Sequence, residues 1–208
     1  MSEQFDIYDE SLRHIGVKSR EAVHRDGDWH QVFHCWVIGR ERDGGEFVIL
    51  QIRNDDKDMY PGKVDISAAG HLEAGENVAD GVREIEEELG LRVKFQDLVP
   101  LGRRLGISRY RDLVDCQISH VFFHECSQPL ADYNYRQEEI TGLLKLPLDT
   151  GLSLLSGEVD SVIVDAVGLK ADRVAIGADD FIPSVDHYAL KTLSLAKRYF
   201  AGEKHLYI

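Results

Sequence analysis

Residues 70–91 read G-H-L-E-A-G-E-N-V-A-D-G-V-R-E-I-E-E-E-L-G-L, and they predict a glycine-bearing turn followed by a helix. The second half is typical of a helix that ends at Gly90, because apolar residues recur at helical spacing before that glycine. These apolar residues are Ala79, Val82, Ile85 and Leu89. Glycines in the preceding turn let the backbone approach a ligand closely. We therefore expect this turn to face a ligand.

Three glutamates, Glu84, Glu87 and Glu88, stand at positions i, i+3 and i+4, so their carboxylates are expected on one helix face. Like charges at this spacing repel, but they become useful around a hard cation, because Mg²⁺ prefers oxygen ligands. The carbonyl of Gly70 offers a further oxygen. An isolated E-x-x-E-E pattern is more often a solvated acidic helix. Its connection to the glycine turn favours a metal site instead, for Mg²⁺ or alternatively Mn²⁺.

The composition is that of an acidic globular protein: 208 residues, 43% hydrophobic, with a formal net charge of -13. This length suits one well-buried domain with an appendage. The negative charge argues against a nucleic-acid backbone or an anionic membrane as partner, because either would be repelled. Three cysteines without a C-x-x-C pair indicate a reducing compartment. Without a signal-peptide pattern or a membrane-length apolar stretch, we expect a cytoplasmic protein.

Alternating and β-branched stretches predict most of the strands. We expect a hairpin over residues 5–17, antiparallel strands over 30–39 and 46–52, a short strand over 64–69, a strand pair over 98–105 and 114–124, and a strand over 140–146. Residues 18–30 are polar, and residues 25–28 within them are interpreted as a loop. A short helix is expected over 147–155, with Pro147 at an early position.

The C-terminal part is less informative. Residues 159–167 fit a strand or a helix, because an apolar run of this length is ambiguous. Residues 183–202 predict a helix. Its apolar face consists of Ala189, Leu193, Ala196 and Phe200. Such a face covers a sheet or forms a dimer contact, so a homodimer is one expectation.

The motif around the predicted helix resembles the Nudix box, G-x5-E-x7-R-E-U-x-E-E-x-G-U, in which U is aliphatic. The residues that match it by type are Gly70, Glu76, Arg83, Glu84, Ile85, Glu87, Glu88, Gly90 and Leu91. One departure is that six residues, rather than seven, separate Glu76 from Arg83. The resemblance implies an α/β fold, specifically an α/β/α sandwich with a mixed sheet, over residues 1–155. Residues 156–208 would then be a C-terminal helical extension, packed on the same domain or at a dimer contact.

The Nudix resemblance also implies metal-dependent hydrolysis of a diphosphate bond in a nucleoside diphosphate-linked or related small molecule. The implied metal ligands are Gly70, Glu84, Glu87 and Glu88. Nudix enzymes differ in the source of the general base, so Glu84 is the first candidate and Glu138 or Glu139 the second. Arg83 and Glu76 are expected to hold the turn on the helix.

Residues outside the box resemble the branch of the family that contains isopentenyl diphosphate isomerase. The segment from Arg53 to Gly62, which includes Lys57 and Pro61, is similar to the diphosphate-binding loop of that enzyme. Two cations on a loop that leads to the metal helix are also well placed for a phosphate on physical grounds. The alternative is a pair of solvated surface charges. Arg53 and Lys57 are the predicted substrate-binding residues.

The isomerase has a second metal site built from histidines and glutamates, and the resemblance implies a counterpart here. The residues that stand in its place are His24, His30, His71, Asp115 and Gln117. The neutral amide of Gln117 weakens such a site, because the isomerase has a carboxylate there. A lone histidine is also more often a hydrogen-bonded structural group than a ligand. Both interpretations of these residues stay open at the level of sequence.

The residue before Gly70 separates hydrolase from isomerase. In the isomerase it is a cysteine that moves a proton at carbon, whereas here it is Ala69, whose methyl group can neither donate nor accept one. The helix keeps R-E-x-x-E-E, from which the isomerase departs. A hydrolase is therefore preferred, and an isomerase-like enzyme and a non-catalytic diphosphate-binding module are the alternatives. The basic segment 103–111 fits either a solvated hairpin tip or a contact with substrate.

Overall fold

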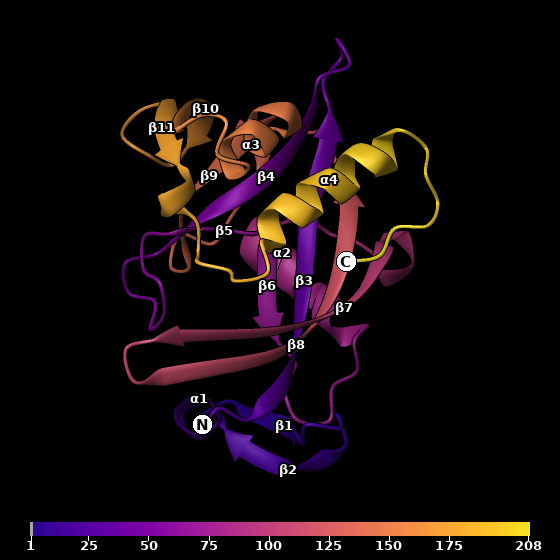
Figure 1. Ribbon diagram of the computed structural model, residues 1–208, viewed down its shortest axis with the longest axis vertical. Coiled ribbons are helices and arrows are strands. Elements are labelled where there is room, and N and C mark those ends of the chain that lie inside the picture. The colour runs from indigo at the N-terminus through magenta and orange to yellow at the C-terminus, as the bar shows by residue number, and fades with distance from the viewer. Residues whose placement is uncertain (1) are drawn as a thin grey trace.

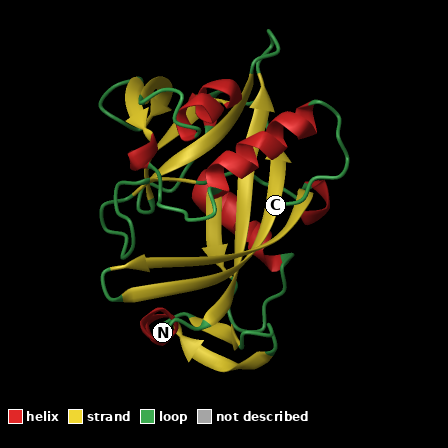
Figure 2. Ribbon diagram, in the orientation of Figure 1, coloured by secondary structure: helices red, strands yellow, loops and turns green. Residues whose placement is uncertain are grey.

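A computed structural model gives the structure of residues 2–208, a mixed β-sheet with helices on both faces (Figures 1 and 2). The strands are β1 (Gln4–Tyr8), β2 (His14–Ser19), β3 (Trp29–Arg40), β4 (Glu46–Arg53), β5 (Val64–Asp65), β6 (Ala68–His71), β7 (Val99–Tyr110), β8 (Leu113–Glu125), β9 (Ile140–Pro147), β10 (Ser161–Val167) and β11 (Arg173–Gly177). The helices are α1 (Arg20–Asp26), α2 (Arg83–Leu89), α3 (Leu148–Leu155) and α4 (Tyr188–Phe200), with 3₁₀ turns η1 (Asp80–Val82), η2 (Phe95–Asp97), η3 (Leu130–Asp132) and η4 (Ala178–Asp180). This is the predicted α/β architecture.

Strand β3 is the central element of the sheet, because it pairs with four other strands. It is antiparallel to β4, β6 and β1 and parallel to β8. The main path of the sheet runs β11-β10-β9-β4-β3-β1-β2, with β5 on β4 and the β7–β8 hairpin attached through β8. The parallel register places Trp29 opposite Cys116 and His30 opposite Gln117. The ends of β3, β6 and β8 therefore lie close together.

Alternation along β3 decides which helix covers which face, because successive side chains of a strand point to opposite sides. Phe33 belongs to the same buried cluster as Ile85 and Leu89 of α2. Trp36 belongs to the other cluster, which includes Leu193 of α4 and residues of α3. Figure 1 shows α4 crossing in front of β3, with α2 behind the sheet. The sheet is thus the middle layer of the α/β/α sandwich.

Residues 20–26 form helix α1, which was not predicted, and the prediction of a loop over residues 25–28 was wrong for Arg25 and Asp26. The side chain of Ser19 accepts a hydrogen bond from the backbone N–H of Ala22 at 3.4 Å, which caps the helix. Gly27 ends the helix in the left-handed conformation, with φ 73°. Helix α1 buries Val23 and His24, and so a polar stretch contributes to the interior.

Several boundaries also differ from the sequence prediction. Strand β7 runs through most of the basic segment, so its arginines lie along a strand as well as at a hairpin tip. The single strand expected over 64–69 is two short strands, β5 and β6. Residues 161–167 form strand β10, which pairs with the unanticipated β11. No helix in residues 2–208 combines the length and the apolar character that a membrane crossing requires.

The C-terminal helix α4 begins at Tyr188, five residues later than predicted. Leu193 and Ala196 on its expected apolar face are fully buried, and Ala189 and Phe200 pack against the same cluster. The expectation that this face covers the sheet is therefore met. Residues 183–187 are not helical, which leaves an irregular segment just before α4.

Candidate active site

The acidic motif lies on α2 and is tied to the preceding turn through Arg83. Its guanidinium donates to Glu76 through Nε at 3.2 Å and Nη2 at 3.1 Å, and Nη2 also donates to the carbonyl of His71 at 3.1 Å. Nη1 lies 3.8 Å from Glu87. The motif has one residue fewer between Glu76 and Arg83 than the Nudix box, yet the two side chains still pair. Gly90 ends α2 with φ 70°, as predicted.

Glu84 packs directly against Gly70 at the end of β6. A β-carbon placed on Gly70 would lie only 1.9 Å from Cδ of Glu84, so any larger residue would displace the carboxyl group. Glu84 is buried and also contacts Arg83. Burial raises the pKa of Glu84 to about 7, because the Arg83 charge offsets only part of the desolvation. Glu84 therefore changes charge near neutral pH.

Glu88 is buried more deeply, behind the same strand. Its Oε2 accepts hydrogen bonds from Gln51 Nε2 at 3.1 Å and from the backbone N–H of Ala69 at 3.0 Å. Burial raises the pKa of Glu88 to about 8, with the nearby charge of Glu84 adding to the shift and the bond from Ala69 opposing it. The sequence analysis did not identify Gln51, because a polar residue in the otherwise apolar run of β4 was the only signal it offered.

The third glutamate, Glu87, has a side chain that is 44% exposed. The three candidate ligand carboxylates of α2 thus differ in environment: two are held behind β6 and one faces solvent. The carboxylates of α2 do not come together as a group of possible metal ligands. In residues 2–208, such a group is formed instead by three histidines and an aspartate. We call this group the histidine cluster.

The histidine cluster consists of His24, His30, His71 and Asp115, whose ligand atoms all lie within 4.8 Å of one another. Its members come from α1, the start of β3, the end of β6 and the start of β8. Asp115 Oδ1 lies 3.4 Å from His30 Nε2 and 3.9 Å from His24 Nε2. Gln117 is not a member, but its Nε2 donates to Asp115 Oδ2 at 2.7 Å and orients that carboxylate.

Four buried polar atoms of the histidine cluster lack partners in the described residues. Nε2 of each of the three histidines and Oδ1 of Asp115 are buried without a hydrogen bond to the described residues. His30 Nδ1 lies 3.0 Å from the carbonyl of Asp28, which can only accept, so Nδ1 carries the proton and Nε2 presents a lone pair. Burial lowers the pKa of all three histidines, and Asp115 opposes the shift at His24 and His30. Neutral imidazoles with free lone pairs next to a carboxylate fit a divalent cation.

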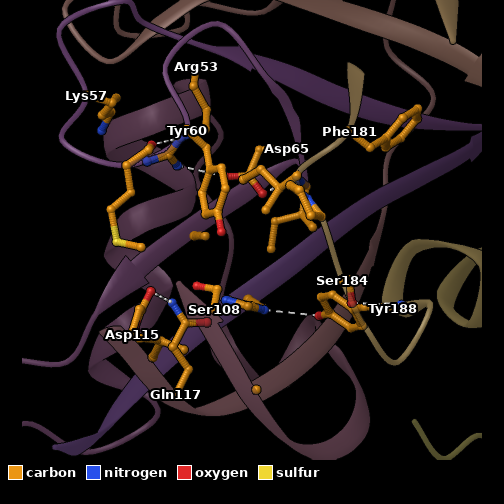
Figure 3. A pocket seen from close by; sticks show the side chains of 18 of the residues that line it. Arg53, Lys57, Tyr60, Asp65, Ser108, Asp115, Gln117, Phe181, Ser184 and Tyr188 are labelled. Atoms are coloured by element: carbon orange, nitrogen blue, oxygen red, sulfur yellow. Dashed lines mark hydrogen bonds and ion pairs between the residues drawn. The ribbon is translucent and has the colours of Figure 1, made fainter. Parts of the chain in front are cut away.

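A cavity of about 270 Å³ opens between these groups. Its wall includes Gly70, the loop residues Arg53 and Lys57, and members of the histidine cluster. In Figure 3, Arg53 and Lys57 lie on one side of the pocket, Asp115 and Gln117 below them, and Phe181, Ser184 and Tyr188 on the other side. The three helix glutamates do not line the cavity; Glu84 lies behind Gly70. The predicted phosphate-binding residues and the histidine cluster therefore share one cavity.

Known proteins resemble this chain in sequence and in fold. Residues 28–150 match the model of the NUDIX domain, which is more than half of the chain. The chain belongs to the Nudix family. An uncharacterised Nudix hydrolase of Clostridium acetobutylicum is 37% identical over 191 residues, which cover 88% of this chain and 92% of that protein. Nudix hydrolase 3 of Arabidopsis thaliana is 33% identical over 75% of this chain, which spans only 21% of that relative.

Solved Nudix structures share the fold. DR0079 from Deinococcus radiodurans superposes with a TM-score of 0.57 at 18% identity, covering 74% of this chain and 90% of that one. A C. elegans Ap4A hydrolase in a binary complex gives a TM-score of 0.51 at 12% identity, covering 83% of this chain and 98% of that one. At these identities the likeness concerns the fold alone. The family match and the relatives of similar sequence, rather than this likeness of fold, identify the chain as a Nudix-type pyrophosphohydrolase.

The two predicted substrate-binding cations of this Nudix protein already have carboxylate partners. Arg53 donates to Asp65 Oδ2 at 2.8 Å and to the carbonyl of Met59 at 3.1 Å. Lys57 Nζ donates to Glu139 Oε2 at 2.8 Å. Burial alone would raise the pKa of Glu139, but the hydrogen bonds from Lys57 and Arg136 outweigh it and hold the pKa below its usual value. A phosphate would have to share both cations with these carboxylates.

The basic segment divides between the two sequence interpretations. Arg104 lines the cavity, where its guanidinium lies 4.3 Å from the ring centroid of Tyr188 and donates to both oxygens of Asp186 at 2.8 Å. Arg103 and Arg109 are exposed. Sequence analysis did not identify Tyr188 or Asp186, because the signal that would have found them is a contact between residues more than 80 positions apart.

Proposed function

We propose that this Nudix enzyme hydrolyses a diphosphate bond in a nucleoside diphosphate-linked or related small molecule, with Mg²⁺ or Mn²⁺ as cofactor. The observation that carries the proposal is the position of Gly70, which lines the cavity on one side and packs against the buried carboxyl of Glu84 on the other. Substrate in the cavity would thus be separated from the acidic helix by a single glycine. Arg53 and Lys57 on the same wall supply positive charge for a diphosphate.

The proposed metal ligands are the carbonyl of Gly70 and the carboxylates of Glu84, Glu87 and Glu88. A bound divalent cation neutralises phosphate charge and lowers the pKa of a coordinated water. Glu84 is the proposed general base, because its carboxyl group lies directly behind Gly70 at the cavity wall. Glu138 is exposed and Glu139 has a lowered pKa, so each is a weaker candidate for this role. Glu76 and Arg83 would hold the turn in place.

A second divalent cation is proposed at the histidine cluster. The support is its set of partnerless buried atoms, three imidazole nitrogens and one carboxylate oxygen. Gln117 would orient Asp115 instead of binding the cation itself. Because members of the cluster and Arg53 line the same cavity, a cation there would carry charge facing the same diphosphate.

The histidine cluster also favours the isomerase-like alternative, since the resemblance to that branch implies it. Against the alternative stands Ala69, which lines the cavity beside Gly70 with only a methyl group. Proton transfer at carbon needs a titratable group at the reacting atom. A hydrolase needs none at this position, so hydrolysis is the better-supported reaction.

The deciding experiment is a panel of nucleotide sugars, dinucleoside polyphosphates, nucleoside triphosphates and isoprenoid diphosphates, assayed for phosphate or nucleotide release with Mg²⁺ or Mn²⁺. We expect cleavage of at least one member that stops when the cation is chelated and resumes when it is restored. Binding without cleavage across the panel would identify a non-catalytic module. Exchange of solvent label into isopentenyl diphosphate would identify an isomerase.

We also propose that residues 156–208 fold together with the Nudix domain of residues 1–155 and are not an independent unit. Strand β10 extends the main sheet through its pairing with β9. Leu193 and Ala196 of α4 belong to the same buried cluster as Trp36 of β3. A unit that shares both the sheet and the core loses buried apolar area when separated.

A further inference from the structure

The far wall of the cavity is built by a segment outside the part of the chain that matches the family model. That match ends at residue 150, whereas residues 181–184, Tyr188 and Ala189 line the cavity. The segment is fixed at its start, where Ile182 N–H donates to the carbonyl of Val64 at 3.1 Å. It is fixed again by the ion pair of Asp186 with Arg104. The C-terminal extension thus contributes a defined surface to the proposed active site.

Tyr188 places its hydroxyl group between two side chains of β3. Trp36 Nε1 donates to this oxygen at 3.0 Å, and His34 Nδ1 lies 3.1 Å from it. Indole N–H can only donate, so the Tyr188 oxygen accepts from Trp36. In the described residues, His34 Nδ1 is the partner left for the hydroxyl proton of Tyr188, which is buried. Tyr188 therefore donates to Nδ1, and the His34 proton resides on Nε2.

His34 is held neutral in this arrangement. It is 93% buried, since 7% of its surface is exposed. Burial lowers its pKa to about 3, and the positive charge of Arg104 adds to the shift. An imidazole with Nδ1 as acceptor and no added proton presents a fixed N–H donor at Nε2.

The Nε2–H group of His34 has no partner in residues 2–208, yet it is not among the fully enclosed polar atoms. The open space that His34 contacts is the cavity, whose wall it helps to form. Trp36, Ile66 and Phe181 give the same cavity apolar and aromatic surface. A ligand that displaces water from the His34 donor without supplying an acceptor would leave this N–H unpaired, which is costly.

We propose that His34 is a specificity-determining residue, which donates a hydrogen bond from Nε2 to an acceptor atom on the non-phosphate group of the substrate. Tyr188, which lies in the C-terminal extension, is the positioning residue that keeps the His34 proton on Nε2. The inference rests on the proposed function, because a diphosphate held near Arg53 and Lys57 leaves the opposite side of the cavity for the rest of the molecule (Figure 3).

The substrate class that fits is a diphosphate whose organic group is largely apolar or aromatic and carries one well-placed oxygen or nitrogen acceptor. A plain hydrocarbon of the same shape would fill the space but leave His34 Nε2–H unpaired. Sites built around a buried donor discriminate against ligands that lack the matching acceptor. The cavity therefore selects against purely hydrocarbon groups.

The test compares two matched probes, benzyl and pyridylmethyl methylenebisphosphonates, which have the same shape and differ by one ring nitrogen. Their affinities for the full-length protein are measured by calorimetry with Mg²⁺ present, with each pyridyl isomer tried. We expect one isomer to bind wild type about tenfold more tightly than the benzyl probe, the value of one net hydrogen bond. Methylene bridges prevent cleavage, so the measurement does not depend on turnover.

Three variants assign the preference to His34. His34→Leu should abolish the preference for the pyridyl probe. His34→Gln should retain most of the preference, because the amide nitrogen reaches the place of Nε2. Tyr188→Phe should reduce the preference, because the His34 proton is then free to move between Nδ1 and Nε2. Tyr199→Phe is the matched control, since it removes a hydroxyl on the same helix that bonds Glu125 outside the cavity. A general packing defect would weaken both probes alike and leave their ratio unchanged.

The proposal is overturned if wild type binds the probes equally or binds neither, or if the preference persists in His34→Leu. Equal binding together with cleavage of a panel substrate would refute the role of His34 and leave the hydrolase intact. A preference that depends on His34, without cleavage of any panel member, would refute the hydrolase and keep the binding role.

Discussion

The acidic helix and the histidine cluster meet at two neighbouring residues, Gly70 and His71. Gly70 packs against Glu84 of α2, while His71 turns into the histidine cluster. The glutamates come from one helix of seven residues, whereas the cluster draws on four elements between residues 24 and 115. One group of proposed ligands is therefore encoded in a local motif, whereas the other comes together only because elements far apart in the sequence pack together.

The two groups respond to burial in opposite directions. Desolvation raises the pKa of Glu84 to about 7 and that of Glu88 to about 8, because the charged form of a carboxylate is disfavoured. The same effect lowers the pKa of the histidines, whose charged form is the protonated one. Burial thus moves both groups toward neutrality, but this prepares only the imidazoles for metal binding. The carboxylates must still lose protons before they bind a cation.

The largest expected effect separates the glutamates by role. Glu84→Gln and Glu88→Gln should lower kcat by about 100- to 1,000-fold, because each removes a carboxylate proposed to bind the metal or accept a proton. Glu87→Gln tests whether the exposed member also belongs to the site. Glu86→Gln is the control, since Glu86 is 53% exposed and pairs with Arg92. Equal turnover in all four variants would reduce the motif to a solvated acidic helix.

A second prediction uses the pH dependence of stability in the metal-free protein. The folded pKa of Glu88, about 8, exceeds its usual value of 4.5, so its contribution to stability is full below pH 4.5 and is lost as pH rises through 8. With about 1.4 kcal/mol per pKa unit, this loss is on the order of 5 kcal/mol. The free energy of unfolding, measured with urea across this pH range, should fall less steeply for Glu88→Gln than for wild type. If the free energies of unfolding of the two proteins had the same pH dependence, the raised pKa of Glu88 would be contradicted.

The histidines should give the opposite sign. Their folded pKa values lie below the usual value of 6.5, so their contribution is present above that value and is lost as pH falls. In the same urea series, His71→Asn should remove a loss of stability that develops as pH falls below 6.5. Glu88→Gln should instead remove a loss that develops as pH rises from 4.5 to 8. If both variants changed the pH dependence in the same sense, the two regions would not be electrostatically distinct.

The smallest expected effect concerns the second cation. Asp115→Asn or His71→Asn should weaken Mn²⁺ or Zn²⁺ binding at the histidine cluster on the order of 100-fold, as measured by calorimetry. His14→Asn provides the control, because His14 is 52% exposed and lies outside the cluster. Glu88→Gln should leave this affinity intact. Failure of wild type to bind either ion at the cluster would return these histidines to a structural role.

Much of the fold followed from periodicity. The pattern of α2 and its glycine stop, the antiparallel pairing of β3 with β4 and the apolar face of α4 are all local regularities, and each was predicted. Helix α1 was missed because Val23 is its one buried apolar residue, although Ser19 and Gly27 flank it as ordinary cap residues. That miss mattered, since α1 carries His24 into the cluster.

The sequence by itself determined the family, the acidic helix and the glycine that lets Glu84 approach β6, because those features depend on spacings of a few residues. Only the tertiary structure decided that Glu87 faces solvent while Glu88 is buried, that His24, His30, His71 and Asp115 converge, and that Tyr188 reaches His34 from 154 positions away. The physical reason is that pKa values, proton positions and cavity walls depend on which surfaces are desolvated against each other. Strand pairing and helix packing set those contacts across the whole chain.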